Sequence, residues 1–154
     1  MLGVQMTRID AINPRLLIDQ HLLSGWREAP RVITLALHWV DKGKSPPCPQ
    51  CWTLGKGHET FAAHHTAWVA RHHAVLTAEC VARGVRLKPR PPLESVPGFD
   101  RDWEPTWEAQ VENLERLDLR ARGMTREPTI RGVRVGRDYY GRMLAEMLAK
   151  ECAA

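Results

Sequence analysis

The sequence has little cysteine, few aromatic residues and no long apolar run. Its four cysteines follow no export signal, so we expect reduced thiols in a cytoplasm and not a disulfide framework. Its apolar stretches fall well short of the ~18 residues that a membrane span needs, and its N-terminus lacks the charged and apolar regions of a signal peptide. With 44% hydrophobic and 26% charged residues over 154 positions, the composition predicts one globular domain and excludes wholesale disorder.

The charge is uneven along the chain. The net charge is +4, which permits a nucleic-acid partner without proving one. Residues 83–90 and 120–142 are mainly basic, whereas residues 94–118 are mainly acidic. This order predicts one cationic and one anionic face on a small body, and a solvated surface with chance clustering is the alternative.

Apolar periodicity predicts an all-α fold. We expect a compact single domain of three to four helices with proline-rich connecting loops. The periodic stretches, with helix stops at Gly43, Gly84 and Gly123, predict helices over residues 15–42, 58–83, 104–122 and 137–150. Pro30 should bend or interrupt the first helix, because it removes a backbone donor and crowds the preceding turn. Residues 43–49 and 88–105 are connectors, and residues 129–135 alternate weakly enough to be extended.

One side of the first predicted helix is polar and carries a carboxylate between cations. Helical spacing brings together His21, Ser24, Arg27, Glu28 and Arg31. Flanking guanidinium groups would hold the Glu28 carboxylate ionised and could grip phosphates on either side of it. The alternative is a solvated face, in which a Glu28–Arg31 pair contributes a few tenths of a kcal/mol.

Cysteine and histidine pairs raise the question of a metal. Cys48 and Cys51 have zinc-site spacing, with His58 and Cys80 as possible further ligands, but one such pair is half a site and we expect no metal. The doublets His64–His65 and His72–His73 are separated by about 11 Å along a helix axis, too far to share an ion. We interpret them as polar helix surface.

Several segments occur in an order that resembles a known family. They are Met6-Thr7-Arg8-Ile9-Asp10, Asp19-Gln20-His21-Leu22, Arg27-Glu28-Ala29-Pro30-Arg31, Leu54-Gly55-Lys56-Gly57-His58 with Thr60-Phe61, and Ala78-Glu79-Cys80 before Arg83-Gly84. Together they resemble the phage-type pyrimidine-dimer DNA glycosylase/AP lyase family, the endonuclease V type of ultraviolet-damage repair. Tyr139-Tyr140-Gly141 is similar to the aromatic C-terminal end of that family.

The resemblance implies a mechanism without metal or cofactor. In this family the α-amino group of a threonine attacks C1′ of the damaged nucleotide, the base leaves, a Schiff base forms, and β-elimination cuts the strand. By position, Thr7 would supply the amine and Glu28 the acid/base. An α-amino group has a pKa of ~7.7–8.0, which leaves a useful neutral fraction at pH 7.

The resemblance also implies the partner and its contacts. We expect a monomer that binds damaged double-stranded DNA in the cytoplasm of a bacterium or phage-infected cell, with no membrane partner. The residues matched to the family's DNA-contacting positions, or proposed beside them, are Arg8, His21, Arg27, Arg31, Lys56, His58, Tyr139 and Tyr140.

Residues 1–6 conflict with this mechanism, because Thr7 has no free α-amine while any residue precedes it. We therefore expect a leader over residues 1–6 that is absent from the active protein, and a glycosylase-like domain over residues 7–154. Two alternatives stay open. A retained leader would leave a non-catalytic DNA-binding relative. The run Ile130–Arg134, in place of the family's tryptophan-containing run, would suit a glycosylase for another modified pyrimidine.

Overall fold

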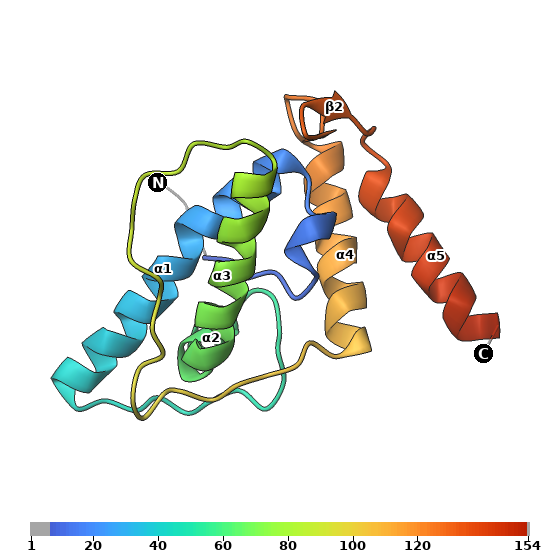
Figure 1. The fold of residues 1–154 in the computed structure, drawn as a ribbon. Helices are drawn as coiled ribbons and strands as arrows, with labels where there is room; N and C mark the ends of the chain where they lie inside the picture. Colours follow the sequence, from blue (N-terminus) through green and yellow to red (C-terminus); the bar gives the residue numbers. More distant parts are fainter. Residues whose placement is uncertain (1–6, 154) are drawn as a thin grey trace.

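The computed structural model describes residues 7–153, which form five α-helices and one small hairpin (Figure 1). In chain order these are α1 (Asp19–Lys42), α2 (His58–His64), α3 (Thr66–Ala82), α4 (Trp107–Arg122), β1 (Thr129–Ile130), β2 (Val133–Arg134) and α5 (Tyr139–Ala153). The two strands are antiparallel and are the predicted extended segment. The all-α class is confirmed, with five helices in place of three or four.

The first helix starts later than predicted. The Asn13 side chain accepts a hydrogen bond from the Arg15 backbone N–H and opens a single 3₁₀ turn, Pro14–Leu16. Extended backbone at Ile18 then separates this turn from α1. At the other end, Gly43 adopts the left-handed conformation at φ 62°, which glycine reaches without a Cβ clash, and the helix stops as predicted.

Pro30 lies inside α1 without interrupting it, so the predicted interruption is wrong. A proline at position 30 cannot donate to the carbonyl of Trp26, four residues earlier. His73 on α3 replaces that donor, because its Nε2 lies 3.2 Å from the Trp26 carbonyl oxygen. The neighbouring helix therefore satisfies the carbonyl that Pro30 leaves free.

The predicted helix over residues 58–83 is two helices, broken at His65. The connector that follows α3 supplies the reason. The Thr66 N–H donates to the carbonyl of Phe99 at 3.0 Å. The Thr66 hydroxyl also donates to this carbonyl and accepts from the Val96 N–H. The His65 N–H still pairs with Ala62 of α2, whereas the Thr66 N–H pairs with the connector, and the helix is interrupted between them.

The interpretation of the histidine doublets as polar helix surface is wrong. His64, His65, His72 and His73 are all buried. His64 and His65 each lie 2.6 Å from a backbone carbonyl oxygen, those of Pro46 and Phe61 respectively. Their rings pack on aromatic neighbours, including His65 stacked on Phe61 with 4.1 Å between ring centroids. Because a ring nitrogen is hydrogen-bonded to a carbonyl and the ring faces pack on aromatic rings, burial of a neutral imidazole costs little free energy.

Residues 7–18 are part of the core. Ile9 and Ala11 belong to one buried cluster with α2 and Trp68, whereas Ile12, Leu17 and Ile18 belong to a second cluster with α4 and α5. Figure 1 shows this blue segment passing between α3 and α4. The N-terminal segment therefore connects the two halves of the hydrophobic core, which fixes the position of its first residues.

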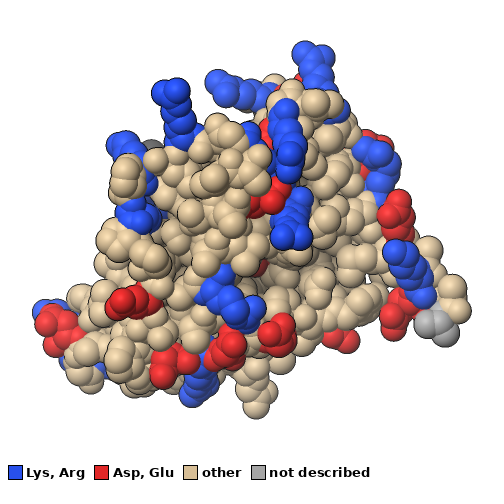
Figure 2. Space-filling model, viewed as in Figure 1, with Lys and Arg blue, Asp and Glu red and all other residues tan. Residues whose placement is uncertain are grey.

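Charged side chains are unevenly placed over one face of the molecule. Figure 2 shows lysine and arginine side chains gathered over the upper part of this face, around the hairpin and the upper ends of α3 and α4, and acidic side chains more common along the lower edge. Among residues 7–153, no helix has the length and apolar character that crossing a membrane requires.

Candidate active site at the N-terminal segment

Four side chains from three helices hold the backbone N–H groups of the N-terminal segment. Thr7 N–H donates to Glu59 Oε1 at 2.8 Å, Arg8 N–H to Glu28 Oε2 at 3.2 Å, Ile9 N–H to His58 Nε2 at 2.8 Å, and Ala11 N–H to Asn113 Oδ1 at 2.6 Å. The fold thus brings the two residues predicted as catalytic, Thr7 and Glu28, to one place.

Two carboxylates lie beside consecutive backbone nitrogens. Glu28 comes from the middle of α1 and Glu59 from the first turn of α2, and both are half-buried. Thr7 itself is buried, at 5% exposure. The nitrogen of residue 7 therefore has one carboxylate as its hydrogen-bond partner and a second on the adjacent residue.

Arg8 and Asp10 form a buried ion pair within the same segment. Arg8 Nε donates to Asp10 Oδ1 at 2.9 Å, and Asn113 Nδ2 donates to the same oxygen at 3.0 Å. Burial alone would raise the pKa of Asp10, but the Arg8 guanidinium and the Asn113 amide outweigh burial and lower it. Arg8 NH1 and Asp10 Oδ2 are buried and have no hydrogen-bond partner among residues 7–153.

His58 is an anchor for the segment. Its Nε2 accepts from Ile9, so its Nδ1 carries the proton and donates to the Thr53 carbonyl at 2.7 Å. Burial lowers the pKa of His58 in spite of the Thr53 bond, which favours this neutral form. Because both ring nitrogens are engaged, His58 has no free polar atom for a DNA phosphate.

His21 and the two C-terminal tyrosines join α5 to the start of α1. His21 Nδ1 lies 2.8 Å from the Tyr140 hydroxyl, which also accepts from Ile18 N–H. Tyr139 donates its hydroxyl to the Leu16 carbonyl. Burial, followed by the nearby Arg8 charge, lowers the pKa of His21 to about 4. Tyr140 is fully buried, so it does not offer its ring to a DNA base.

Of the residues predicted to contact DNA, three cations are exposed. Arg27 and Arg31 project from α1 on the side of Glu28, and Lys56 lies in the turn before α2. Arg8, in contrast, is buried against Asp10. Arg120 on α4 is also exposed and lies near this group. Burial and then the charge of Arg8 lower its pKa, and the charges of Asp10 and Glu28 act in the opposite direction.

The candidate zinc ligands do not come together. Cys48 is half-buried and Cys51 exposed in the loop before α2, whereas Cys80 is buried in α3. His58 already uses both ring nitrogens. Over the described part of the chain, no group of three or more His, Cys, Asp or Glu residues is placed to hold a metal ion.

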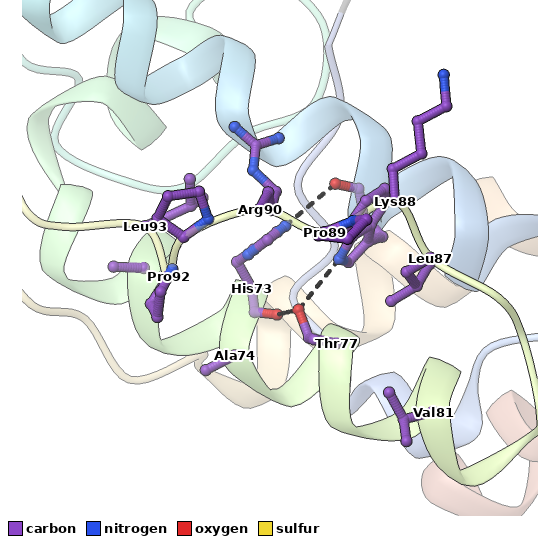
Figure 3. A pocket seen from close by; sticks show the side chains of 13 residues that line it. His73, Ala74, Thr77, Val81, Leu87, Lys88, Pro89, Arg90, Pro92 and Leu93 are labelled. Carbon is purple, nitrogen blue, oxygen red and sulfur yellow. Dashed lines mark hydrogen bonds between the residues drawn. The ribbon is translucent and has the colours of Figure 1, made fainter.

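A pocket of about 370 Å³ lies on another side of α1 (Figure 3). Its walls are Trp26, α3 and the proline-rich residues 87–93. Trp26 and Glu28 are two positions apart, so their side chains point about 200° apart around the helix. The pocket is therefore separate from the carboxylates at the N-terminal segment.

Sequence reasoning missed Glu59 and Asn113. Asn113 lies in a helical stripe with Ala109 and Leu117, all three buried, and a polar residue in such a stripe was the available signal. Glu59 gave a weaker signal, because it follows His58 at the start of a short helix and its partner lies 52 positions away.

A helical domain that buries its N-terminal segment between carboxylates, with exposed arginines on the same helix, has the features of an enzyme that acts on nucleic acid. Comparison with protein families agrees. Residues 6–92 match the family described as pyrimidine dimer DNA glycosylase. The match covers more than half of the chain, so the chain belongs to this family, as the sequence motifs predicted. It is a DNA glycosylase of DNA-damage repair, and its substrate is DNA.

Proposed function

We propose that the protein excises a cyclobutane pyrimidine dimer from duplex DNA and then cuts the strand by β-elimination, through a Schiff base on the α-amino group of Thr7. The observation that carries the proposal is the proximity of the Thr7 nitrogen to Glu28, whose carboxylate accepts from the next N–H along the chain. A nucleophilic nitrogen beside an acid/base group is the arrangement that covalent catalysis needs.

The reaction has two stages. The neutral amine attacks C1′ of the damaged nucleotide, the new N–C1′ bond replaces the glycosidic bond, and the base leaves with that electron pair and takes up a proton. Glu28 takes the proton that the attacking nitrogen loses and gives it to O4′ as the C1′–O4′ bond breaks, which leaves the nitrogen joined to C1′ as the Schiff base. Glu28 then takes the proton from C2′, and the electrons left by this proton expel the 3′ phosphate.

Cations around the carboxylates support binding of the DNA backbone. Arg27 and Arg31 are exposed on the side of α1 that carries Glu28, and Lys56 is exposed near Glu59. We assign these three to phosphate contacts, with the protein acting as a monomer. Arg8, the residue after Thr7, keeps a buried NH1 that has no partner within residues 7–153, so it holds an unused donor.

The N-terminus supplies the decisive experiment. Residues 1–6 lie outside the described residues, and the mechanism requires a chain that begins at Thr7. We would compare such a chain with one that keeps residues 1–6, using borohydride trapping on an abasic-site oligonucleotide. We expect only the chain that begins at Thr7 to be trapped. A longer chain that binds this DNA without being trapped would be the non-catalytic form.

Glu28→Gln, made in the chain that begins at Thr7, tests the acid/base group. This variant should bind DNA as well as the parent or better, because it removes a charge that repels phosphate, but it should neither be trapped nor nick. Oligonucleotides with defined lesions would separate a pyrimidine dimer from another modified pyrimidine. Equal trapping of the long and short chains would show that the Thr7 amine is not the nucleophile, and Lys56 would be the next residue to test.

A further inference from the structure

Consecutive residues at the start of α2 hold alternate residues of the N-terminal segment. His58 accepts from Ile9 N–H, and Glu59 accepts from Thr7 N–H. His58 and Glu59 are adjacent in the first turn of α2, so one turn of helix meets both N–H groups. The His58 bond to the Thr53 carbonyl fixes the ring, and hence the start of α2, relative to the preceding loop.

Glu59 therefore occupies a place that Glu28 does not. Its Oε1 is 2.8 Å from the Thr7 nitrogen, whereas the Glu28 carboxylate bonds the Arg8 nitrogen at 3.2 Å. In a chain that begins at Thr7, the same nitrogen would be an α-amino group, and one of its hydrogens would keep the direction of the present N–H.

We propose that Glu59 is a positioning residue for the nucleophile, which holds the Thr7 nitrogen beside Glu28 through this hydrogen bond. The inference rests on the proposed function, in which that nitrogen attacks C1′. It divides the work between the two carboxylates: Glu59 orients the amine, and Glu28 stays free to exchange protons with the sugar.

The charge of Glu59 has a second consequence. A carboxylate beside an amine favours the protonated form, which is not a nucleophile, so it moves the onset of reaction to higher pH. Glu59 bonds the nitrogen itself, and Glu28 and His58 bond the next two N–H groups of the segment. The other charged and titratable groups are Arg8 and Asp10 on the segment, and His21 on α1 and Arg120 on α4, which interact with Arg8 and Asp10. Replacement of Glu59 alone changes one negative charge and leaves the others in place, so the direction of the shift is fixed.

Two substitutions separate orientation from charge. Glu59→Gln keeps an oxygen that can accept from the Thr7 nitrogen and removes the charge, whereas Glu59→Ala removes both. We would measure the rate of borohydride trapping on an abasic-site oligonucleotide from pH 5 to 9, with the chain that begins at Thr7. Glu94→Gln is the matched control, because Glu94 is exposed in the connector after α3. Melting temperatures of all variants show whether each is folded.

We expect Glu59→Gln to keep the plateau rate and to reach half of it about one pH unit lower than the parent. Glu59→Ala should show the same shift and a plateau lower by tenfold or more, and Glu94→Gln should match the parent. An unshifted profile in Glu59→Gln, with the parent trapped normally, would overturn the role of Glu59 and leave the proposed function intact. Failure of the parent to be trapped would overturn both.

Discussion

His73 and Pro30 should be energetically coupled, because they share one carbonyl. Pro30 leaves the Trp26 carbonyl without its helical donor, and His73 Nε2 lies 3.2 Å from that oxygen. His73→Phe removes the donor but keeps a ring that can stack on Trp26, as the imidazole does at 5.7 Å between centroids. A buried carbonyl left unsatisfied costs about 1–3 kcal/mol. This bond is partly buried, so we expect the unfolding free energy to fall by about 1 kcal/mol, near the lower end of that range.

Pro30→Ala restores the missing N–H and provides the matched background. In that background the helix itself supplies a donor to the Trp26 carbonyl. The loss of unfolding free energy caused by His73→Phe should therefore be smaller than in the parent by about 1 kcal/mol. The four proteins form a double-mutant cycle, and urea unfolding at pH 7.5 gives each unfolding free energy. Burial lowers the pKa of His73, so its ring is neutral at this pH.

The difference between the two costs is the coupling energy. A coupling energy of less than about 0.5 kcal/mol, which is within the range of additive sites, would refute the assignment of His73 as the substitute donor. Equal slopes of the four unfolding curves against urea are needed for the comparison, because a changed slope means that the unfolded or folded state has itself changed.

Three further predictions follow from burial and charge. Burial is the main cause that lowers the pKa values of His21 and His72 to about 4, from 6.5 in the unfolded chain. Their contribution to the unfolding free energy is therefore complete above pH 6.5 and is lost as the pH falls toward 4. Protonation of each should lower the unfolding free energy by about 2 kcal/mol between pH 7 and 5. If urea unfolding gave His72→Phe the same dependence of unfolding free energy on pH as the parent, this prediction would be contradicted. Arg27→Ala and Arg31→Ala should each weaken DNA binding and reduce the salt dependence by about one counterion; unchanged slopes in both would put the DNA on another surface. Asn113→Ala leaves the Ala11 N–H without an acceptor and removes a donor to Asp10, so it should lower the unfolding free energy by about 2–4 kcal/mol. A loss of less than about 1 kcal/mol in urea unfolding would show that Asn113 does not hold the segment in this way.

Local patterns predicted the helices because the faces of long helices are set by their own sequence. The α1 stop at Gly43 and the separation of α3 from α4 by a proline-rich connector were visible in this way. The break at His65 was not, because its cause is the connector around Phe99, which lies more than 30 positions away. The interruption predicted at Pro30 was wrong for the same reason. The donor that Pro30 lacks is supplied by His73, which lies on another helix.

The histidines show the limit of polarity as a guide to burial. A histidine needs only one or two partners for its ring nitrogens, and backbone carbonyls supply them at His64 and His65. A sequence does not reveal which carbonyls are left free by a loop or a proline, so the burial of such residues follows only from the tertiary structure. Thr7 and Glu28, in contrast, were found through family resemblance, and their proximity agrees with it.

The anchors of the N-terminal segment change in character along its length, and the proposed chemistry accounts for the order. At Ile9 and Ala11 the partners are the neutral imidazole of His58 and the neutral amide of Asn113. At residues 7 and 8 they are the carboxylates of Glu59 and Glu28. Neutral partners hold the backbone with a strength that does not vary as a proton or a phosphate comes and goes. As partners of the segment's N–H groups, carboxylates occur at residues 7 and 8, where the proposed mechanism has an amine lose a proton and a sugar exchange one. In that mechanism, groups fixed before the substrate binds lie next to the charge that develops there.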